Sequence, residues 1–163
     1  IFFIQERNGA GNIPFGCFKF RTMKINSEIG AVHATKHDPR VTGIGRFLRK
    51  TSIDELPQFI NVFIGNMSLI GPRPQAIKFN ENYAEMLKNS PSKMNIISRH
   101  YVKPGVTGLA QCMGYRGDVS TLADIEGRVN LDRYYIEHWS FWLDIKIIFL
   151  TVVSLIRGSD KAF

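Results

Sequence analysis

The centre of the chain reads SIDELPQFINVF from Ser52 to Phe63. Ser52 and Glu55 have the S-x-x-E spacing of a capping box, which predicts that a helix begins here. The apolar residues of this segment fall on one helical stripe, which we expect to be buried. They are Ile53, Leu56, Ile60 and Phe63.

A polar stripe on the same predicted helix carries Asp54, Gln58 and Asn61 and faces elsewhere. Pro57 lies just past the first turn, so regular helix could also begin nearer Asp54. In both cases Asp54 lies at a helix N-terminus, where free N–H groups and the helix dipole keep a carboxylate ionised. An ionised aspartate is a candidate nucleophile, although acidic residues in a first turn are more often simple helix-end features.

The flanking sequence predicts one α+β domain over residues 1–163, mostly helical with a small antiparallel β-hairpin. Apolar runs at 1–5 and 15–23 surround a turn cluster at 8–12, which is typical of a hairpin. Helical spacing predicts further helices at about 44–50, 75–88, 124–137 and 140–156. Gly and Pro punctuate residues 99–115, which we expect to form a strand and loops.

Composition restricts the function to partners with negative charge. The 163 residues carry 21 Lys and Arg against 14 Asp and Glu, a formal charge of +7. Nucleic acid, phosphorylated substrates and anionic lipid all fit such a balance. Two cysteines are too few for a disulfide framework. His33 and His37 lack a third metal ligand, so we interpret these two histidines as solvated loop residues.

Basic residues occur in three groups that could bind phosphate oxygens. They are Lys19 with Arg21, Arg46 with Arg49 and Lys50, and Arg73 between two prolines. Each group could also be a solvated surface. A carboxylate repels a phosphate, so phosphoryl chemistry at Asp54 would need a divalent cation, and Glu55 is the adjacent oxygen ligand for Mg²⁺. These residues together indicate an aspartyl-phosphate route.

Five motifs occur in the order found in one known family: KFRTM from Lys19, DPRV from Asp38, SIDELPQ from Ser52, GPRP from Gly71 and KPGVTG from Lys103. The chain resembles the bacterial sugar transferases, also called monotopic phosphoglycosyltransferases, over nearly all of its length. The segment WSFWLDIK from Trp139 fits as well. In addition, residues 108–117 are similar to the branch of the family that starts with glucose or galactose phosphate.

The resemblance implies transfer of a sugar 1-phosphate from a UDP-sugar to polyprenyl phosphate through a covalent aspartyl-phosphosugar intermediate. Asp54 would be the nucleophile and Glu55 would bind Mg²⁺. The remaining residues carried over would hold phosphates or shape the pocket; they are Lys19, Arg49, Arg73, Gln111, Arg116 and Asp132. The implied location is the cytoplasmic face of the bacterial inner membrane, and the family's membrane-entering helix is expected upstream of Ile1.

Two interpretations without catalysis remain as alternatives: a basic membrane-surface module and a nucleic-acid-binding module. The sequence contains no helix-turn-helix, RNP-type or zinc-finger pattern, which disfavours the second. Helix 140–156 is rich in apolar and aromatic residues, a spacing typical of a core helix, and the resemblance favours a membrane-facing surface instead. Neither the sugar nor the oligomeric state follows from the sequence.

Overall fold

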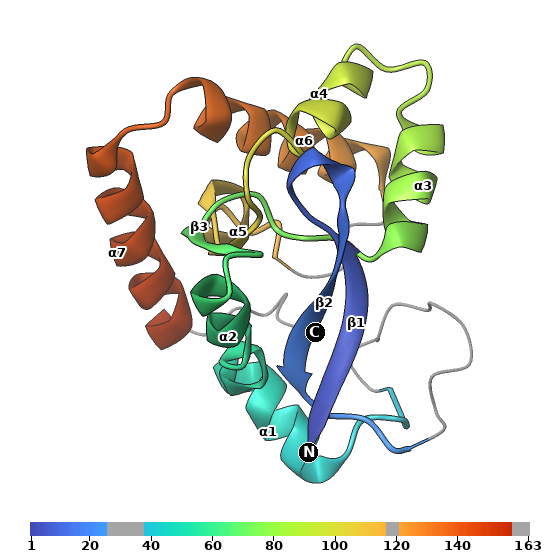
Figure 1. Cartoon of the computed structure of the whole chain (residues 1–163), viewed down its shortest axis with the longest axis vertical. Helices are drawn as coiled ribbons and strands as arrows, with labels where there is room; N and C mark the ends of the chain where they lie inside the picture. The colour runs from blue at the N-terminus through green and yellow to red at the C-terminus, as the bar shows by residue number, and fades with distance from the viewer. Residues whose placement is uncertain (26–37, 117–120, 158–163) are drawn as a thin grey trace.

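The computed structural model describes residues 1–25, 38–116 and 121–157 (Figure 1). Within these ranges the chain forms seven α-helices, two short 3₁₀ turns and four strands in two small sheets. The predicted α+β class, mostly helical with a small β-hairpin, is confirmed. The predicted loop residues His33 and His37 lie outside the described residues.

The hairpin forms as the sequence predicts. Strand β1 (Phe2–Asn8) pairs antiparallel with β2 (Pro14–Phe20), and it runs lengthwise through the molecule (Figure 1). The two strands are joined by a 3₁₀ turn, η1 (Ala10–Asn12), in which Gly11 has a φ of 63°. The Gly11 N–H donates to the His100 carbonyl at 2.7 Å, so the turn is tied to a distant part of the chain.

The start of the central helix differs from the prediction. Helix α1 (Gly43–Thr51) ends at Ser52, which has a left-handed φ of 60° and makes no side-chain cap. Because Ser52 closes α1, it cannot take the extended conformation of an N-cap, and the predicted capping box is wrong. The chain instead forms a 3₁₀ turn, η2 (Ile53–Glu55), and helix α2 (Gln58–Phe63) begins after Pro57.

Burial on α2 is the reverse of the prediction. Gln58 and Asn61 are 1% and 0% exposed, whereas Phe63 is 92% exposed and Leu56 and Ile60 are also exposed. The Asn61 side chain explains this orientation, since its oxygen accepts from the Phe18 N–H at 2.9 Å and its amide donates to the Gly16 carbonyl at 2.8 Å. These bonds dock the polar stripe of α2 against β2 and leave the apolar stripe outside.

A second sheet, which the sequence did not predict, joins β3 (Ser68–Ile70) to β4 (Gly105–Thr107) in parallel. Beyond it, the Gly71 N–H donates to the Thr107 carbonyl at 2.9 Å. A Cβ atom on Gly105 would lie 2.1 Å from the Gly71 nitrogen, so only glycine permits this approach. The contact fixes the Gly71–Pro74 segment beside residues 105–108.

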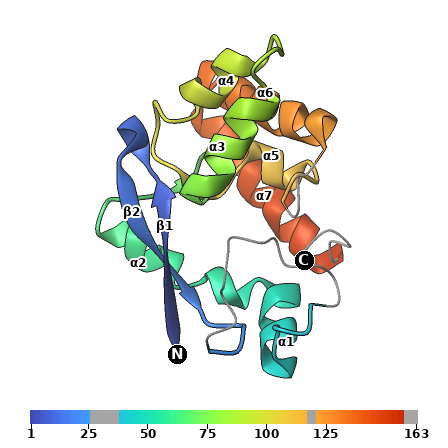
Figure 2. The ribbon, with the colours of Figure 1, turned by 90° about the vertical axis from the view of Figure 1, so that its right-hand side faces the viewer.

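The remaining helices surround these sheets. They are α3 (Ile77–Met86), α4 (Lys93–Ser98), α5 (Leu109–Cys112), α6 (Leu122–Glu137) and α7 (Phe141–Arg157). Helices α3, α4 and α6 gather at one end of the molecule and α1 lies at the other (Figures 1 and 2). The sequence predicted α3, α6 and α7 but not the short α4 and α5. None of the helices in the described ranges is long and apolar enough to cross a membrane.

We predict that Asn61→Ala lowers the free energy of unfolding by about 3 kcal/mol. The substitution removes two buried hydrogen bonds and leaves the Phe18 N–H and the Gly16 carbonyl without these partners. Urea denaturation measures the loss. The exposed Asn66 on the loop after α2 supplies the matched control, and Asn66→Ala should cost less than about 0.5 kcal/mol. Equal stability of both variants would contradict the anchoring role of Asn61.

Candidate active site

The Glu55 carboxylate lies at the centre of an ion cluster. Its Oε1 is 3.0 Å from Lys19 Nζ and 2.6 Å from Arg73 Nη2, and its Oε2 is 3.1 Å from Arg116 Nη2. Lys19 comes from β2, Arg73 from the segment after β3, and Arg116 from the segment after α5. The cluster therefore joins four parts of the chain that are distant in sequence.

Glu55 is held in its ionised form. Burial alone would raise its pKa, but the charges of Arg73 and Lys19, the hydrogen bonds from Arg73 and the charge of Arg116 outweigh burial. The pKa of Glu55 consequently lies well below its ordinary value of 4.5. Both oxygens accept from cations, with Arg73 Nη1 adding a fourth contact at 3.3 Å, so the carboxylate has little capacity for further ligands.

Asp54, the adjacent residue on the same 3₁₀ turn, lacks the contacts that Glu55 makes. It is 9% exposed, and no hydrogen bond or ion pair joins its carboxylate to another described residue. Burial raises the pKa of Asp54; Lys19 opposes this shift, and the negative charge of Glu55 adds to it. Asp54 is thus a buried carboxylate with uncommitted lone pairs beside a group of cations.

Contacts fix Arg73 both at its guanidinium and along its backbone. Its Nη1 also donates to Gln111 Oε1 at 3.1 Å. On the backbone side, Arg99 Nη2 donates to the Arg73 carbonyl at 2.8 Å, and Arg7 donates to the Pro74 carbonyl. A guanidinium held this way presents a fixed fork to an oxyanion.

The structure brings together five of the eight site residues that the sequence indicated, and places three nearby or behind. These five form one connected cluster, in which Glu55 contacts Lys19, Arg73 and Arg116, and Gln111 contacts Arg73. Asp54 adjoins them. Arg49 bonds Thr22 Oγ1 at 2.9 Å, and its charge acts on Asp54.

Asp132 lies behind the ion cluster. It is 2% exposed and pairs with Arg99 at 2.9 Å, so it reaches Arg73 only through Arg99. The other basic residues singled out on α1, Arg46 and Lys50, are exposed to solvent. Arg99 and Arg7 were missed because nothing in the sequence around them distinguishes a buried arginine from a solvated one.

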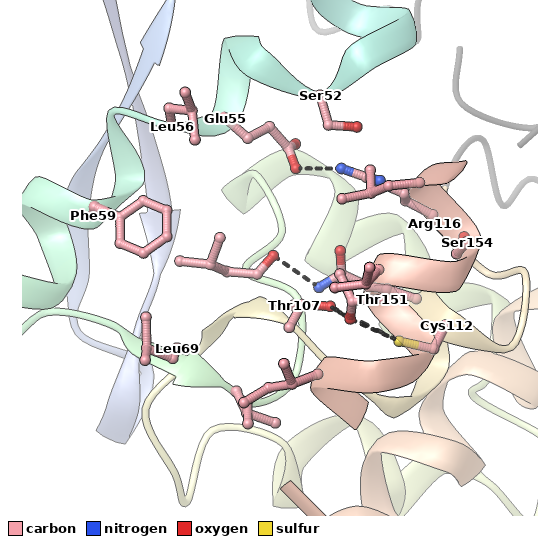
Figure 3. Close-up of a pocket in the computed structure, with 16 residues that line it drawn as sticks. Ser52, Glu55, Leu56, Phe59, Leu69, Thr107, Cys112, Arg116, Thr151 and Ser154 are labelled. Carbon is pink, nitrogen blue, oxygen red and sulfur yellow. Dashed lines mark hydrogen bonds and ion pairs between the residues drawn. The ribbon is translucent and has the colours of Figure 1, made fainter. Parts of the chain in front are cut away.

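An apolar cavity of about 370 Å³ adjoins the cluster between α2 and α7. Figure 3 shows Leu56 and Phe59 on one side of it and Thr151 and Ser154 on the other. Glu55 and Arg116 line its polar end and are joined by one of the dashed contacts in the view. The cavity thus connects an apolar wall to the charged cluster.

Comparison with known proteins gives a family match. A model of the family described as bacterial sugar transferase matches residues 1–158. Over 93% of its length the chain is 50% identical to the UDP-glucose:undecaprenyl-phosphate glucose-1-phosphate transferase of Escherichia coli K12, and it covers 32% of that protein. A protein of the same name from Xanthomonas campestris is 45% identical over the whole chain, which covers 33% of it.

A third relative differs in the sugar that its name contains. The UDP-N-acetylgalactosamine-undecaprenyl-phosphate N-acetylgalactosaminephosphotransferase of Aeromonas hydrophila is 43% identical over 97% of the chain, which covers 36% of that protein. The chain therefore spans about a third of the length of these three relatives. Relatives with similar identity to the chain therefore carry different sugars in their names.

We predict that Glu55→Gln lowers the free energy of unfolding by about 3 kcal/mol near neutral pH. The substitution removes the negative partner of three partly or fully buried cations while keeping the side-chain shape. Thermal or urea unfolding measures the effect. Glu85→Gln is the matched control, because the Glu85 side chain is 75% exposed and pairs with Lys88 on the surface, and it should be nearly neutral.

The difference between wild type and Glu55→Gln should also depend on pH. Because the folded-state pKa of Glu55 is lowered, its stabilisation is complete above 4.5 and is lost as pH falls through the lower folded-state value. The stability difference should therefore be constant from about pH 5 to 7 and shrink in acid. A difference that stays constant into acid would contradict the assigned ionisation.

Proposed function

The chain belongs to the bacterial sugar transferase family, and from this premise we propose that it transfers a sugar 1-phosphate from a UDP-sugar to polyprenyl phosphate. The observation that carries the proposal is the pair of adjacent carboxylates, with Asp54 unpartnered among the described residues and Glu55 held by three cations. Relatives named as transferases from UDP-sugars to undecaprenyl phosphate support the two substrate classes. Because relatives of similar identity name different sugars, the sugar stays open.

In the first proposed step an Asp54 oxygen attacks the β-phosphorus of the UDP-sugar. A bond forms between that oxygen and phosphorus, and the bond from the β-phosphorus to the oxygen bridging the two phosphates breaks. UMP leaves with the bridging oxygen, and the sugar phosphate stays on Asp54 as an acyl phosphate. The raised pKa of Asp54 also makes its carboxylate more basic than an ordinary aspartate.

In the second proposed step a phosphate oxygen of the polyprenyl phosphate attacks the same phosphorus. The bond to Asp54 breaks, the carboxylate is regenerated, and the product is a polyprenyl diphosphate sugar. The charges of Lys19, Arg73 and Arg49 oppose the effect of burial on Asp54 and so favour the regenerated carboxylate, although its pKa stays above the ordinary value. Transfer thus needs no free water.

Lys19, Arg73 and Arg116 supply the positive charge that phosphoryl transfer requires. In the free protein these cations are engaged by Glu55, and a diphosphate would compete with Glu55 for them. Gln111 orients one guanidinium nitrogen of Arg73 at 3.1 Å. These cations are gathered around one buried carboxylate and not spread over an open face, so the described residues give no support to a nucleic-acid-binding module.

Mg²⁺ is part of the proposal, with Glu55 as its protein ligand beside phosphate oxygens of the donor. Carboxylate oxygens are the ligand type that this ion prefers, and one or two of them are usual. Competition by a diphosphate for the cations would release lone pairs on Glu55 for the ion. No group of three or more Asp, Glu, His or Cys side chains that could hold a metal occurs among the described residues. When bound, the ion would neutralise phosphate charge.

A membrane-facing surface is the last part of the proposal. The outward face of α2 and the neighbouring face of α7 expose large apolar side chains, which supports contact with lipid at the level of the cavity. These are Leu56, Phe59, Ile60, Phe63, Phe141, Trp142, Ile145, Ile148, Phe149, Val152 and Leu155. A prenyl phosphate would then meet Asp54 at the membrane surface.

We predict that Asp54→Asn lowers UMP release from a UDP-sugar by at least about a thousandfold, because an amide is not a nucleophile for this step. Mass spectrometry should find the phosphosugar adduct in wild type and not in the variant, and should also exclude deamidation of the new side chain. Asp124→Asn, at the start of α6, is the control and should keep wild-type activity. UMP release by the Asp54→Asn variant at the wild-type rate would refute the assignment of Asp54 as the nucleophile.

In wild type, activity should fall in acid through a pKa above 3.8, because burial raises the pKa of Asp54.

We also predict that the protein co-sediments with vesicles of anionic phospholipid, more weakly at high salt. Phe63 and its neighbour Ile64 at the end of α2 are 92% and 55% exposed. The double change Phe63→Ser and Ile64→Ser should weaken binding at least about tenfold, since burying one phenylalanine is worth about 2 kcal/mol. Ile13→Ser, in the hairpin turn, is the control, because Ile13 is 68% exposed and lies away from α2 and α7 in sequence. Equal sedimentation of the double variant and wild type would exclude α2 from the membrane surface.

A further inference from the structure

The cavity between α2 and α7 has one charged end and a mostly apolar wall. At one end Glu55 and Arg116 line it, and most of the remaining wall is apolar, with Phe59, Val106 and Ile148 among the side chains. A few serine, threonine and glutamine side chains interrupt this wall. Its volume of about 370 Å³ lies within the range of small-molecule pockets. An occupant that matches this wall has a charged or polar end and an apolar body.

The polar side chains deep in the cavity are already satisfied. Thr151 Oγ1 lies 2.8 Å from Thr107 Oγ1, lies 3.1 Å from Cys112 Sγ, and donates to the Ile147 carbonyl at 2.8 Å. These groups therefore turn methyl and methylene surface toward the cavity. A sugar ring or a uridine would lose hydrogen bonds with water here and find few in return.

One side of the cavity opens to the outside of the molecule. Leu56, Phe59, Val152 and Leu155 line it and are also between 44% and 51% exposed. In Figure 3, Leu56 and Phe59 face the α7 side across the opening. An apolar chain too long for the cavity can therefore leave over the apolar faces of α2 and α7.

We propose that this cavity binds the phosphate-proximal isoprene units of the polyprenyl phosphate acceptor, with the phosphate at the Arg116 end and the rest of the chain leaving between α2 and α7. The inference rests on the proposed function and names the part of the acceptor that the protein itself recognises. The cationic Arg116 at one end and the mostly apolar wall distinguish this occupant from the nucleotide sugar. The donor diphosphate would use the cation cluster, Arg116 included, in the first step, and Arg116 would take the acceptor phosphate after UMP has left.

The test separates the two half-reactions in the enzyme held in mixed micelles. Exchange of radiolabelled UMP into the UDP-sugar reports the first step and needs no acceptor, whereas lipid-linked product reports both. Val152→Trp adds bulk at the half-exposed rim of the cavity. Met86→Trp is the matched control, because Met86 at the end of α3 has a similar exposure of 43% and does not line the cavity.

Val152→Trp should keep UMP exchange within about twofold of wild type and raise the KM for undecaprenyl phosphate at least about tenfold. Met86→Trp should change neither quantity. With wild type, kcat/KM should rise over the first few isoprene units of a series of prenyl phosphates, and Val152→Trp should flatten this rise. A photoreactive group in the first isoprene units should label α2 or α7 of the wild-type protein.

Three results would overturn the inference: an unchanged KM in Val152→Trp, an equal rise in both tryptophan variants, or loss of UMP exchange together with transfer. The photolabelling of wild type decides the matter if Val152→Trp does not fold, since labels outside the cavity would also overturn it. Absence of both exchange and transfer in wild type is a different result, because it refutes the proposed function itself.

Discussion

The fold around the active site depends on the ion cluster of Glu55. One carboxylate contacts Lys19, Arg73 and Arg116, and these cations come from the hairpin, from the segment after β3 and from the segment after α5. The apolar cluster around Tyr135 and Ile147 contains Ile70 of β3 and packs against Leu109 and Cys112 of α5, so it joins the elements that lead to Arg73 and Arg116. Neither of the two buried apolar clusters contains a hairpin residue, and the ion pair of Lys19 with Glu55 adds an electrostatic link between the hairpin and these elements.

The orientation of α2 likewise depends on polar contacts. A short helix with one polar and one apolar stripe normally buries the apolar one. Here Asn61 bonds backbone groups of β2, and Glu55 bonds its cations, so the polar stripe faces inward. The apolar stripe is then left for a partner outside the chain, and α7 presents a similar face beside it.

Much of the fold could be predicted because its signals are local. Alternation predicted the hairpin, and helical spacing predicted α1, α3, α6 and α7. The capping box failed because Ser52 was already used to end α1, a competition that spacing alone does not show. The parallel pairing of β3 with β4 and the support of Arg73 by Arg99 depend on contacts between residues far apart in sequence, which no local pattern encodes. The residues that meet at Glu55 were found through motifs, not through periodicity.

The contrast between Asp54 and Glu55 gives a physical reason for keeping two adjacent carboxylates in such a site. Burial raises the pKa of both groups, and only the one that the cations reach directly is held ionised well into acid. Without Glu55, the buried cations would repel one another whenever no substrate is bound. If Asp54 were the only carboxylate in the site, the same cations would pair with it and block its attack. Glu55 thus stands in for an anionic substrate in the free protein, and Asp54 stays available to attack one when it arrives.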